Sequence, residues 1–237
     1  MKVLVLGHGG MLGHIVVNYL LENNINVEEA HGKWSTEEFI KGVLSFNGDY
    51  IVNCIGAIPQ KTDHFEINYD LPIWLDKNAK CRVIHPGTDC EMDNDHYGTS
   101  KRNASDFIKI DGKNTKIIKA SIIGHELETS FGLLEWFLNT EGEVSGYAKA
   151  YWNGATTLEW SKKCMDMMLN WDDYDIENIL QSECISKYTL LKIISKVYNK
   201  DVVIRKYNSI AVNKCLVGGI KIPPIDIQLR ELKEFCS

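Results

Sequence analysis

The sequence predicts an α/β fold, a Rossmann-type doubly wound parallel sheet with a smaller C-terminal lobe. Three observations carry this prediction. Short β-branched segments alternate with helical segments from residue 2 to about residue 123, a pattern typical of βαβ units. A run of glycines follows the first of these segments at the mouth of the first helix. After residue 124 the alternation loosens without a low-complexity linker, which indicates the smaller lobe.

The N-terminal elements follow from their hydrophobic patterns. Runs of β-branched residues and leucine predict strands, and these runs are KVLVL (2–6), INVEEA (25–30), DYIVNCIGA (49–57), CRVIHPG (81–87) and TKIIKASIIG (115–124). Apolar residues at helical spacing predict helices between them, over 11–24, 35–46 with a Ser/Thr cap, 67–79 and 96–110. Because connections between parallel strands are right-handed, helices are expected to cover both faces of the sheet.

The C-terminal elements are less regular. The patterns predict a helix over 133–139, a loop and a short strand in 142–155, helices over 156–171 and 186–199, strands over 178–182 and 201–207, and a proline-started helix over 222–235. We therefore expect residues 1–123 to form a dinucleotide-binding core. Helix 157–171 and the strand near residue 179 are expected to return to this core, and residues 124–237 mainly form a substrate-binding lobe.

Composition excludes several classes of function. With 237 residues and 44% hydrophobic content, the chain can bury a substantial core. It carries 26 basic and 32 acidic residues and has no basic run interleaved with aromatics, so nucleic acid is not an expected partner. No apolar stretch approaches the roughly 18 residues of a membrane span, and the N-terminal apolar run is too short for a signal peptide. We expect a cytoplasmic protein without a membrane partner.

Cysteine and histidine spacing gives no metal-binding pattern. The seven cysteines are odd in number and scattered, without a C-x-x-C pair, and the seven histidines lack a ligand pair such as H-x-x-x-H. The sequence therefore predicts reduced thiols in a cytoplasm-like compartment and no metal site.

The motif GHGGMLG places glycines at a spacing that suits a dinucleotide. A glycine at the turn permits positive φ, a second lets a pyrophosphate approach the backbone, and a third lets the helix pack on the strand. The phosphates would then face the free N–H groups at the helix N-terminus. A turn that only permits the fold is the alternative interpretation. The predicted cofactor contacts in this turn are Gly7, Gly9, Gly10, Met11, Leu12 and Gly13.

The end of the second strand should discriminate NAD from NADP. An acid there holds the ribose diol of NAD, whereas a base suits the phosphate of NADP. Glu28 and Glu29 lie within the strand or at its end, and His31 and Lys33 follow it. Which side chain faces the ribose stays open. We favour NADP because of Lys33 and because of the reductive direction expected below.

The segment YGTSK sets Tyr97 and Lys101 one helical turn apart, on the same face of the helix after the fourth strand. A nearby ammonium favours the phenolate and lowers the pKa of a tyrosine. Thr88 ends the fourth strand, where ligands of doubly wound sheets bind, and its hydroxyl can donate to a carbonyl oxygen. The alternative is a solvent-exposed helix face. The position favours a catalytic set of Thr88, Tyr97 and Lys101.

Together these motifs resemble the extended short-chain dehydrogenase/reductases, and most of all the branch of dTDP-4-dehydrorhamnose reductase and related nucleotide-sugar enzymes. VLGHGGMLGH, DYIVNCIGAIPQ, VIHPGTDC and YGTSK carry the resemblance to the superfamily. GLLEWFL and WNGATT point more narrowly to the nucleotide-sugar branch. One departure is a short segment, residues 90–96, between the threonine strand and the tyrosine helix. Family members usually have a longer segment there that helps to cover the substrate.

The resemblance implies further site residues. Asn53, Gly56 and Ala57 would contact the cofactor, as would Tyr97 and Lys101, whose ammonium would reach the ribose hydroxyls of the nicotinamide half. Independently of the resemblance, Asn68 in the next helix is a candidate for positioning backbone. The implied substrate contacts are Thr88, Asp89, Gly124, His125, Glu126, Trp152, Asn153 and Thr156.

The implied activity is NADPH-dependent reduction of a dTDP- or UDP-linked 4-keto-6-deoxy sugar, in deoxysugar or polysaccharide biosynthesis. NADP is preferred over NAD as the cofactor, the nucleotide sugar is the expected partner, and a homodimer is the candidate assembly. Two alternatives stay open. One is a nucleotide-sugar epimerase that retains a tightly bound NAD. The other is a dinucleotide-binding regulatory subunit without turnover, like that of methionine adenosyltransferase.

Overall fold

The computed structural model describes all 237 residues, which divide into two compact units. Unit 1 comprises residues 1–119 and 161–178, and unit 2 comprises residues 120–160 and 179–237. No helix is both long enough and apolar enough to cross a membrane.

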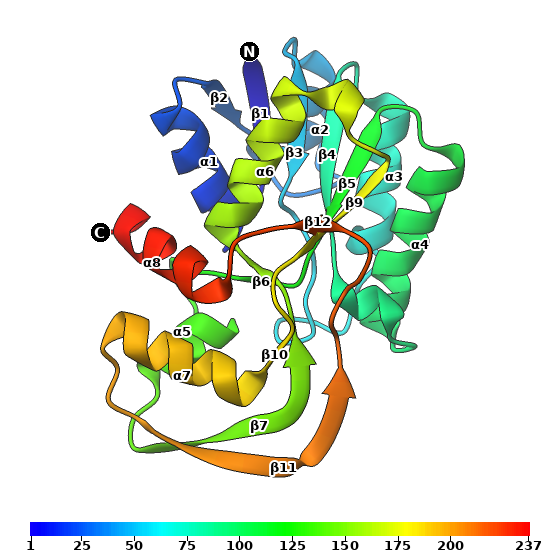
Figure 1. Ribbon diagram of the computed structural model, residues 1–237. Coiled ribbons are helices and arrows are strands. Elements are labelled where there is room, and N and C mark those ends of the chain that lie inside the picture. Colours follow the sequence, from blue (N-terminus) through cyan, green and yellow to red (C-terminus); the bar gives the residue numbers. More distant parts are fainter. The chain divides into compact units, whose positions relative to one another are not determined.

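The central sheet has seven strands in the order β12-β9-β5-β4-β3-β1-β2 (Figure 1). Their bounds are β1 (Lys2–Leu6), β2 (Asn26–Glu29), β3 (Tyr50–Asn53), β4 (Arg82–Gly87), β5 (Thr115–Lys119), β9 (Glu177–Gln181) and β12 (Ile220–Lys221). The pairs β1–β2, β1–β3, β3–β4, β4–β5 and β9–β12 are parallel. The chain order reverses between β1 and β3, the switch point at which doubly wound sheets bind ligands. The predicted Rossmann-type fold is confirmed.

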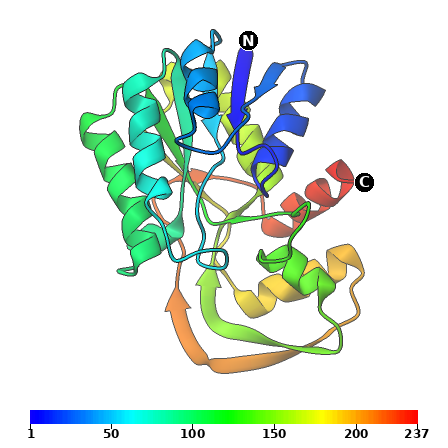
Figure 2. The same ribbon diagram turned by 180° about the vertical axis from the view of Figure 1, so that it is seen from behind.

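Helices cover both faces of this sheet in unit 1. They are α1 (Gly13–Glu22), α2 (Glu37–Ser45), α3 (Ile67–Asn78), α4 (His96–Asp111) and the unit 1 part of α6 (Thr157–Leu169). Figures 1 and 2 show α2, α3 and α4 on one face, with α1 and α6 on the other. Thr36 caps α2, because its hydroxyl accepts a hydrogen bond from the Phe39 N–H, as the Ser/Thr pattern predicts.

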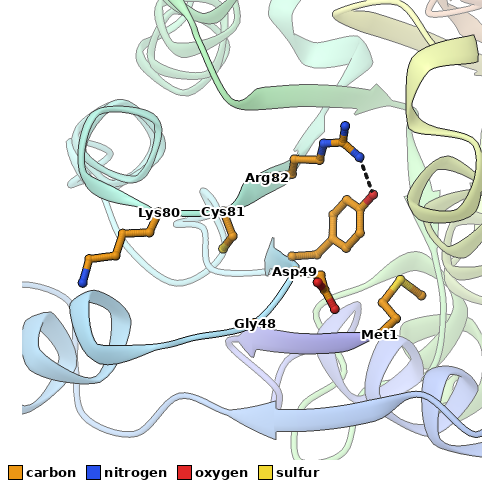
Figure 3. Close-up of a pocket in the computed structure, with 7 residues that line it drawn as sticks. Met1, Gly48, Asp49, Lys80, Cys81 and Arg82 are labelled. Carbon is orange, nitrogen blue, oxygen red and sulfur yellow. Dashed lines mark hydrogen bonds between the residues drawn. The ribbon is translucent and has the colours of Figure 1, made fainter.

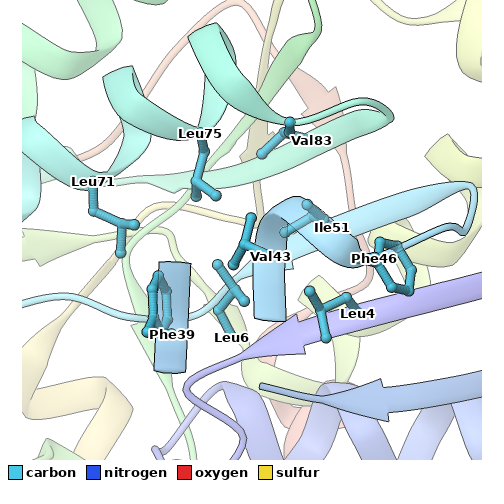
Figure 4. Packing of buried hydrophobic residues seen from close by; sticks show 10 residues of the cluster. Leu4, Leu6, Phe39, Val43, Phe46, Ile51, Leu71, Leu75 and Val83 are labelled. Carbon is cyan, nitrogen blue, oxygen red and sulfur yellow. The ribbon is translucent and has the colours of Figure 1, made fainter. Parts of the chain in front are cut away.

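A hydrophobic cluster packs α2 and α3 against β1, β3 and β4 (Figure 4). Its fully buried members include Leu6, Ile51, Leu71 and Leu75. Burying one such side chain contributes about 1.5 to 3 kcal/mol. Since Leu6 directly precedes the glycine turn, this packing also fixes where the turn begins.

Unit 2 contains two small sheets and three helices. The three-stranded sheet has the order β10-β7-β11 and the two-stranded sheet pairs β6 with β8. The strands are β6 (Ile122–Ile123), β7 (Glu143–Trp152), β8 (Ala155–Thr156), β10 (Ile185–Ser186) and β11 (Val203–Asn213). The helices are α5 (Leu133–Asn139), α7 (Lys187–Tyr198) and α8 (Ile225–Phe235).

Four strand predictions differ from the structure. The predicted strand 49–57 ends at Asn53, and the residues after it form a loop. The predicted strand 115–124 ends at Lys119, and Ile122–Ile123 forms β6 instead. Residues 142–155 contain a ten-residue strand, β7, rather than a loop with a short strand, and β11 runs well past residue 207. β7 and β11 pair with each other in parallel register from Glu143 and Val203 onwards. This non-local pairing leaves no signal in a local hydrophobic pattern.

The prediction of seven reduced thiols is wrong for two cysteines. Cys184 and Cys215 form a disulfide with a Cα–Cα distance of 5.9 Å, and the other five cysteines are free. β10 and the end of β11 flank the end of β7, since Ile185 pairs with Trp152 and Asn213 pairs with Tyr151. This pairing brings together two cysteines that are 31 positions apart.

Candidate active site

The glycine turn after β1 is shaped by two steric requirements. Gly7 has φ of +75°, a conformation that favours glycine. A Cβ on Gly13 would lie 2.1 Å from the Gly7 carbonyl oxygen, so no side chain fits there. The Gly10 N–H donates to the same oxygen at 3.0 Å. Gly7 and Gly13 are therefore required by the protein's own packing.

Gly9 and Gly10 have no such requirement. A Cβ on Gly9 would meet nothing within 4 Å, and one on Gly10 would have only the Gly7 oxygen, at 3.3 Å. The hydrogen bonds of α1 start with His14 N–H to Gly10 O, and the N–H groups of residues 11–13 have no backbone acceptor. The backbone of Gly9 is therefore open to close approach by a ligand. The turn thus fits the phosphates of a dinucleotide, which need donors and close backbone approach.

Because Gly13 is required for packing and Gly9 is not, two matched variants can distinguish an effect on folding from an effect on cofactor binding. Gly13→Ala is expected to lower the free energy of unfolding by about 3 kcal/mol, because the methyl group overlaps the Gly7 carbonyl. Gly9→Ala should change it by less than about 0.5 kcal/mol, while weakening dinucleotide binding. Urea unfolding and fluorescence titration with NADPH measure the two effects. Unchanged NADPH affinity in folded Gly9→Ala would remove the turn from the site.

The end of β2 brings Glu29, rather than Lys33, to the glycine turn. The Glu29 carboxylate lies 3.6 Å from Nε2 of His8, which belongs to the turn. The His31 ring meets the His8 ring edge-on at 6.1 Å between centroids. Lys33 is exposed, and its backbone carbonyl oxygen accepts a hydrogen bond from the Thr36 hydroxyl. The residues placed beside His8 of the turn are therefore one acid, Glu29, and one imidazole, His31.

Asn53 ends β3 and is fully buried. Its side-chain oxygen Oδ1 accepts the Ile55 N–H at 3.0 Å, and its side-chain nitrogen Nδ2 lies 3.1 Å from Nδ1 of His85. His85 is equally buried, and its Nε2 has no hydrogen-bond partner. Burial and the positive charge of Lys101 hold the pKa of His85 well below its usual range, so its imidazole is neutral. Sequence reasoning missed His85, because a histidine inside a strand gives no local signal of its partners.

Asn68 of α3 holds the loop after β3, as expected for a residue that positions backbone. Its side-chain oxygen accepts the Ala57 N–H at 2.8 Å, and its side-chain nitrogen donates to the Ala57 carbonyl at 3.0 Å. A Cβ on Gly56 would lie 3.2 Å from the same side-chain oxygen. Gly56 and Ala57 are thereby fixed at the carboxyl end of β3, next in the sheet to β1 and its glycine turn.

Thr88 follows β4 and caps the short 3₁₀ helix η1 (Asp89–Met92). Its hydroxyl donates to the Asp89 carboxylate at 3.1 Å and accepts the Cys90 N–H at 3.3 Å. The Thr88 side chain lies close enough to the Tyr97 phenol to lower its pKa, against the larger effect of burial. The structure therefore brings Thr88, Asp89 and Tyr97 together.

The pKa of the Tyr97 phenol is raised in the structure, whereas the sequence predicts that it is lowered. Burial, followed by the charges of Cys90 and Asp89, raises the pKa of Tyr97 above its ordinary value, and Lys101 is not among the groups that lower it. Lys101 is buried and donates to the Pro86 carbonyl at 2.9 Å. The expected lowering of the phenol pKa by this ammonium is wrong for the structure. Tyr97 is a protonated phenol at neutral pH, which suits a proton donor.

The six residues expected on the substrate side beyond residue 123 all lie in unit 2. Several of their polar groups hold the chain together. His125 contacts Glu135 at 2.5 Å and the Tyr198 hydroxyl at 2.9 Å. Asn153 bonds the backbone of Leu216 in both directions.

The remaining contacts in this set are similar. The Glu126 carboxylate accepts the Thr129 hydroxyl and the Gly132 N–H. The Thr156 N–H donates to the Gln228 side chain at 2.9 Å. Trp152 is buried, and a Cβ on Gly124 would overlap Thr157 at 2.3 Å. These residues build unit 2 in the structure.

A pocket of about 580 Å³ lies elsewhere in unit 1 (Figure 3). It is lined by Met1, Gly48, Asp49, Tyr50, Lys80, Cys81 and Arg82, which precede or begin β1, β3 and β4. Arg82 donates to the Tyr50 hydroxyl across it. The pocket therefore opens at the amino ends of the strands, whereas the glycine turn, Asn53 and Thr88 follow the carboxyl ends. No group of three or more His, Cys, Asp or Glu side chains is placed to hold a metal ion.

The sheet order, the glycine turn and the polar residues after β3 and β4 define a Rossmann-type fold of the dinucleotide-binding kind. Solved structures share this fold. A dTDP-4-dehydrorhamnose reductase from Clostridium acetobutylicum has a TM-score of 0.72 at 17% sequence identity, with 100% of this chain and 99% of that chain covered. A dTDP-4-dehydrorhamnose reductase from Bacillus anthracis, solved in complex with NADP, has a TM-score of 0.75 at 15% identity, with 98% of each chain covered.

A further similar structure is a dTDP-glucose 4,6-dehydratase from Bacillus anthracis in complex with NAD. Its TM-score is 0.72 at 14% identity, with 99% of this chain and 96% of that chain covered. No model of a protein family and no curated protein matches the sequence. At these identities the likeness shows a shared fold, and at the level of the fold the predicted resemblance to dTDP-4-dehydrorhamnose reductases is confirmed.

Proposed function

We propose that the chain is an NADPH-dependent reductase of a nucleotide-activated 4-keto-6-deoxy sugar. One observation carries the proposal: Thr88 and the protonated phenol of Tyr97 lie together after β4, in a fold that also presents a glycine turn with free N–H groups. The full-length likeness to dTDP-4-dehydrorhamnose reductases supports the substrate class. Unit 1 then supplies a proton donor for the ketone oxygen and a binding site for the cofactor phosphates.

The proposed roles follow from the positions of the side chains. The nicotinamide, when bound, supplies the hydride. The Thr88 hydroxyl would exchange its Asp89 acceptor for the ketone oxygen and polarise it. Tyr97 would deliver its proton to the oxygen as negative charge develops there. Lys101 would exchange the Pro86 carbonyl for a ribose hydroxyl of the cofactor.

The charge of Lys101 should make cofactor affinity depend on pH. Burial lowers the pKa of Lys101 to about 8, with Glu91 and Cys90 opposing that shift. The ammonium is therefore present below about pH 8 and is lost as the pH rises through this value. We expect the affinity for NADPH to decrease over the same range in fluorescence titrations. Lys101→Met should bind NADPH more weakly, and its affinity should no longer depend on pH in this range. If the affinity of the variant decreases with pH as it does in the wild type, another group causes the pH dependence.

NADPH rather than NADH is proposed as the reductant on the basis of Lys33 and of the Bacillus anthracis reductase solved with NADP. Glu29 acts in the opposite direction, because a carboxylate at the end of β2 suits the ribose diol of NAD. Lys33→Glu is expected to shift the NADPH/NADH preference toward NADH by about tenfold, equivalent to 1.4 kcal/mol, and Glu29→Gln to shift it toward NADPH. Ratios of kcat/KM measure both. A shift in Glu29→Gln alone would place the discrimination at Glu29.

The function itself is tested with the purified chain and a panel of dTDP- and UDP-linked 4-keto-6-deoxy sugars. NADPH oxidation with stoichiometric formation of the reduced sugar is the expected result. Stoichiometric NAD that survives gel filtration, with epimerised product and no net oxidation, would instead show the epimerase. No turnover on any sugar, together with a stable complex with another protein, would show the regulatory subunit.

A further inference from the structure

A buried carboxylate lies directly behind Thr88. Glu91 of η1 is 6% exposed, and its Oε1 accepts the Thr88 N–H at 2.9 Å. The Thr88 hydroxyl in turn accepts from the backbone of η1, so the two residues form a capping box. The backbone and the hydroxyl of Thr88 are thereby held from both sides by the segment that follows it.

Glu91 also begins a chain of charged side chains. Its Oε2 lies 2.8 Å from Nζ of Lys119 on β5, and the same Nζ lies 2.9 Å from Glu177 on β9. The other oxygen of Glu177 lies 3.3 Å from Lys109 of α4, which pairs with Asp106 at the surface. The inner pair, Glu91 and Lys119, has side chains only 6% and 10% exposed.

Stability alone does not explain such a buried pair. Removing two charges from water is costly, and apolar residues of similar volume often replace a buried pair at no loss of stability. The pair orients the Glu91 carboxylate, because Lys119 holds one of its oxygens while the other accepts the Thr88 N–H.

The rest of the short segment is seated on α4. Arg102 donates to the carbonyls of Glu91 and Asp93, at 2.8 and 2.9 Å. A Cβ on Gly98 would lie 2.2 Å from the Cys90 carbonyl, so this glycine of the YGTSK motif permits the close approach. Segment 90–96 is thus held at several points, so that it can support Thr88.

We infer that Glu91, oriented by Lys119, is a positioning residue that holds Thr88 in place beside Tyr97. The inference rests on the proposed function only for its catalytic consequence. The positional claim concerns the Thr88 backbone and can be measured without turnover.

Two double variants isolate this role. Both remove the buried charges together, which avoids leaving one of them unpaired. Glu91→Gln with Lys119→Met retains an acceptor for the Thr88 N–H, whereas Glu91→Leu with Lys119→Met removes it. Lys109→Met, at the exposed end of the chain of charges, is the control.

Amide hydrogen exchange at Thr88 and steady-state kinetics are the readouts. In the Leu variant, Thr88 exchange is expected to be at least about tenfold faster, which corresponds to 1.4 kcal/mol, with amides of the β1 and β3 core unchanged. The kcat for the keto-sugar should fall by a similar factor, while the KM for NADPH stays constant. The Gln variant should lie between the Leu variant and wild type, because it keeps an acceptor for the Thr88 N–H but loses the orientation by Lys119. Lys109→Met should stay close to wild type in both readouts.

Equal Thr88 exchange in the folded Leu and Gln variants would overturn the inference. So would a kcat loss that the Gln variant shares in full, because that loss would belong to the charges and not to the Thr88 contact. If Thr88 exchange responds as expected but the wild-type chain reduces no keto-sugar, the proposed function fails and the positioning of Thr88 by Glu91 stands.

Discussion

Tyr97→Phe is expected to lower turnover of the keto-sugar by a factor on the order of 100 to 10,000, the range for a positioned proton donor. The phenol lies with Thr88, and burial raises its pKa, so at neutral pH it holds the proton that the reduction requires. The ring itself packs edge-on against Phe65 at 5.7 Å, and phenylalanine keeps that contact. Folding and NADPH affinity should therefore stay nearly unchanged, as measured by urea unfolding and fluorescence titration.

Two further variants complete this test. Tyr69→Phe removes an exposed phenol from α3 and serves as the matched control, with turnover expected to match wild type. Thr88→Val should raise the activation free energy of the reduction by roughly 3 kcal/mol, and so lower turnover, if Thr88 acts as an oxyanion donor. If Tyr97→Phe retains more than half of the wild-type rate, YGTSK is not the catalytic element, and the regulatory subunit becomes the better interpretation.

Asp76→Ala is expected to lower the free energy of unfolding by about 3 kcal/mol, because it leaves several donors without their acceptor. Asp76 lies near the end of α3 and is 2% exposed. Its carboxylate accepts the N–H groups of Lys113 and Asn114 and, at 2.7 Å, the Thr115 hydroxyl. These bonds fix the turn between α4 and β5, and with it the start of the strand that carries Lys119.

Urea unfolding with a constant m-value checks this expectation. Asp70→Ala is the matched control, since Asp70 is an exposed aspartate in the first turn of the same helix. Its loss should cost no more than about 1 kcal/mol, through the helix dipole. Equal losses in the two variants would show that the buried hydrogen bonds of Asp76 contribute nothing beyond helix stability.

Local patterns were sufficient for much of the Rossmann core. β1, the glycine turn and α1 follow from one strand run, glycine spacing and helical periodicity, and the structure contains all three. The helix that carries Tyr97 and Lys101 was predicted over 96–110 and is observed over His96–Asp111. These features depend on the conformational preferences of neighbouring residues, which a sequence states directly.

The direction of side chains within the site could not be obtained in the same way. Helical spacing placed Lys101 on the face of Tyr97, but the ammonium reaches the Pro86 carbonyl of β4 instead. Glu91 gave no signal in the sequence, because its partners Lys119 and Glu177 come from β5 and β9. His85 likewise gave no signal, because its side-chain partner, Asn53, lies 32 positions earlier in the sequence.

The sequence by itself determined the alternation of strands and helices, the glycine turn and the presence of a Thr, Tyr and Lys set after β4. Only the tertiary structure decided that Glu29 faces the turn, that Glu91 lies behind Thr88, and that β7 pairs with β11. The physical reason is the range of the interactions. Periodicity and turn preferences act over a few residues, whereas the pKa of a buried group and the partner of a strand depend on residues that only folding brings within a few ångströms.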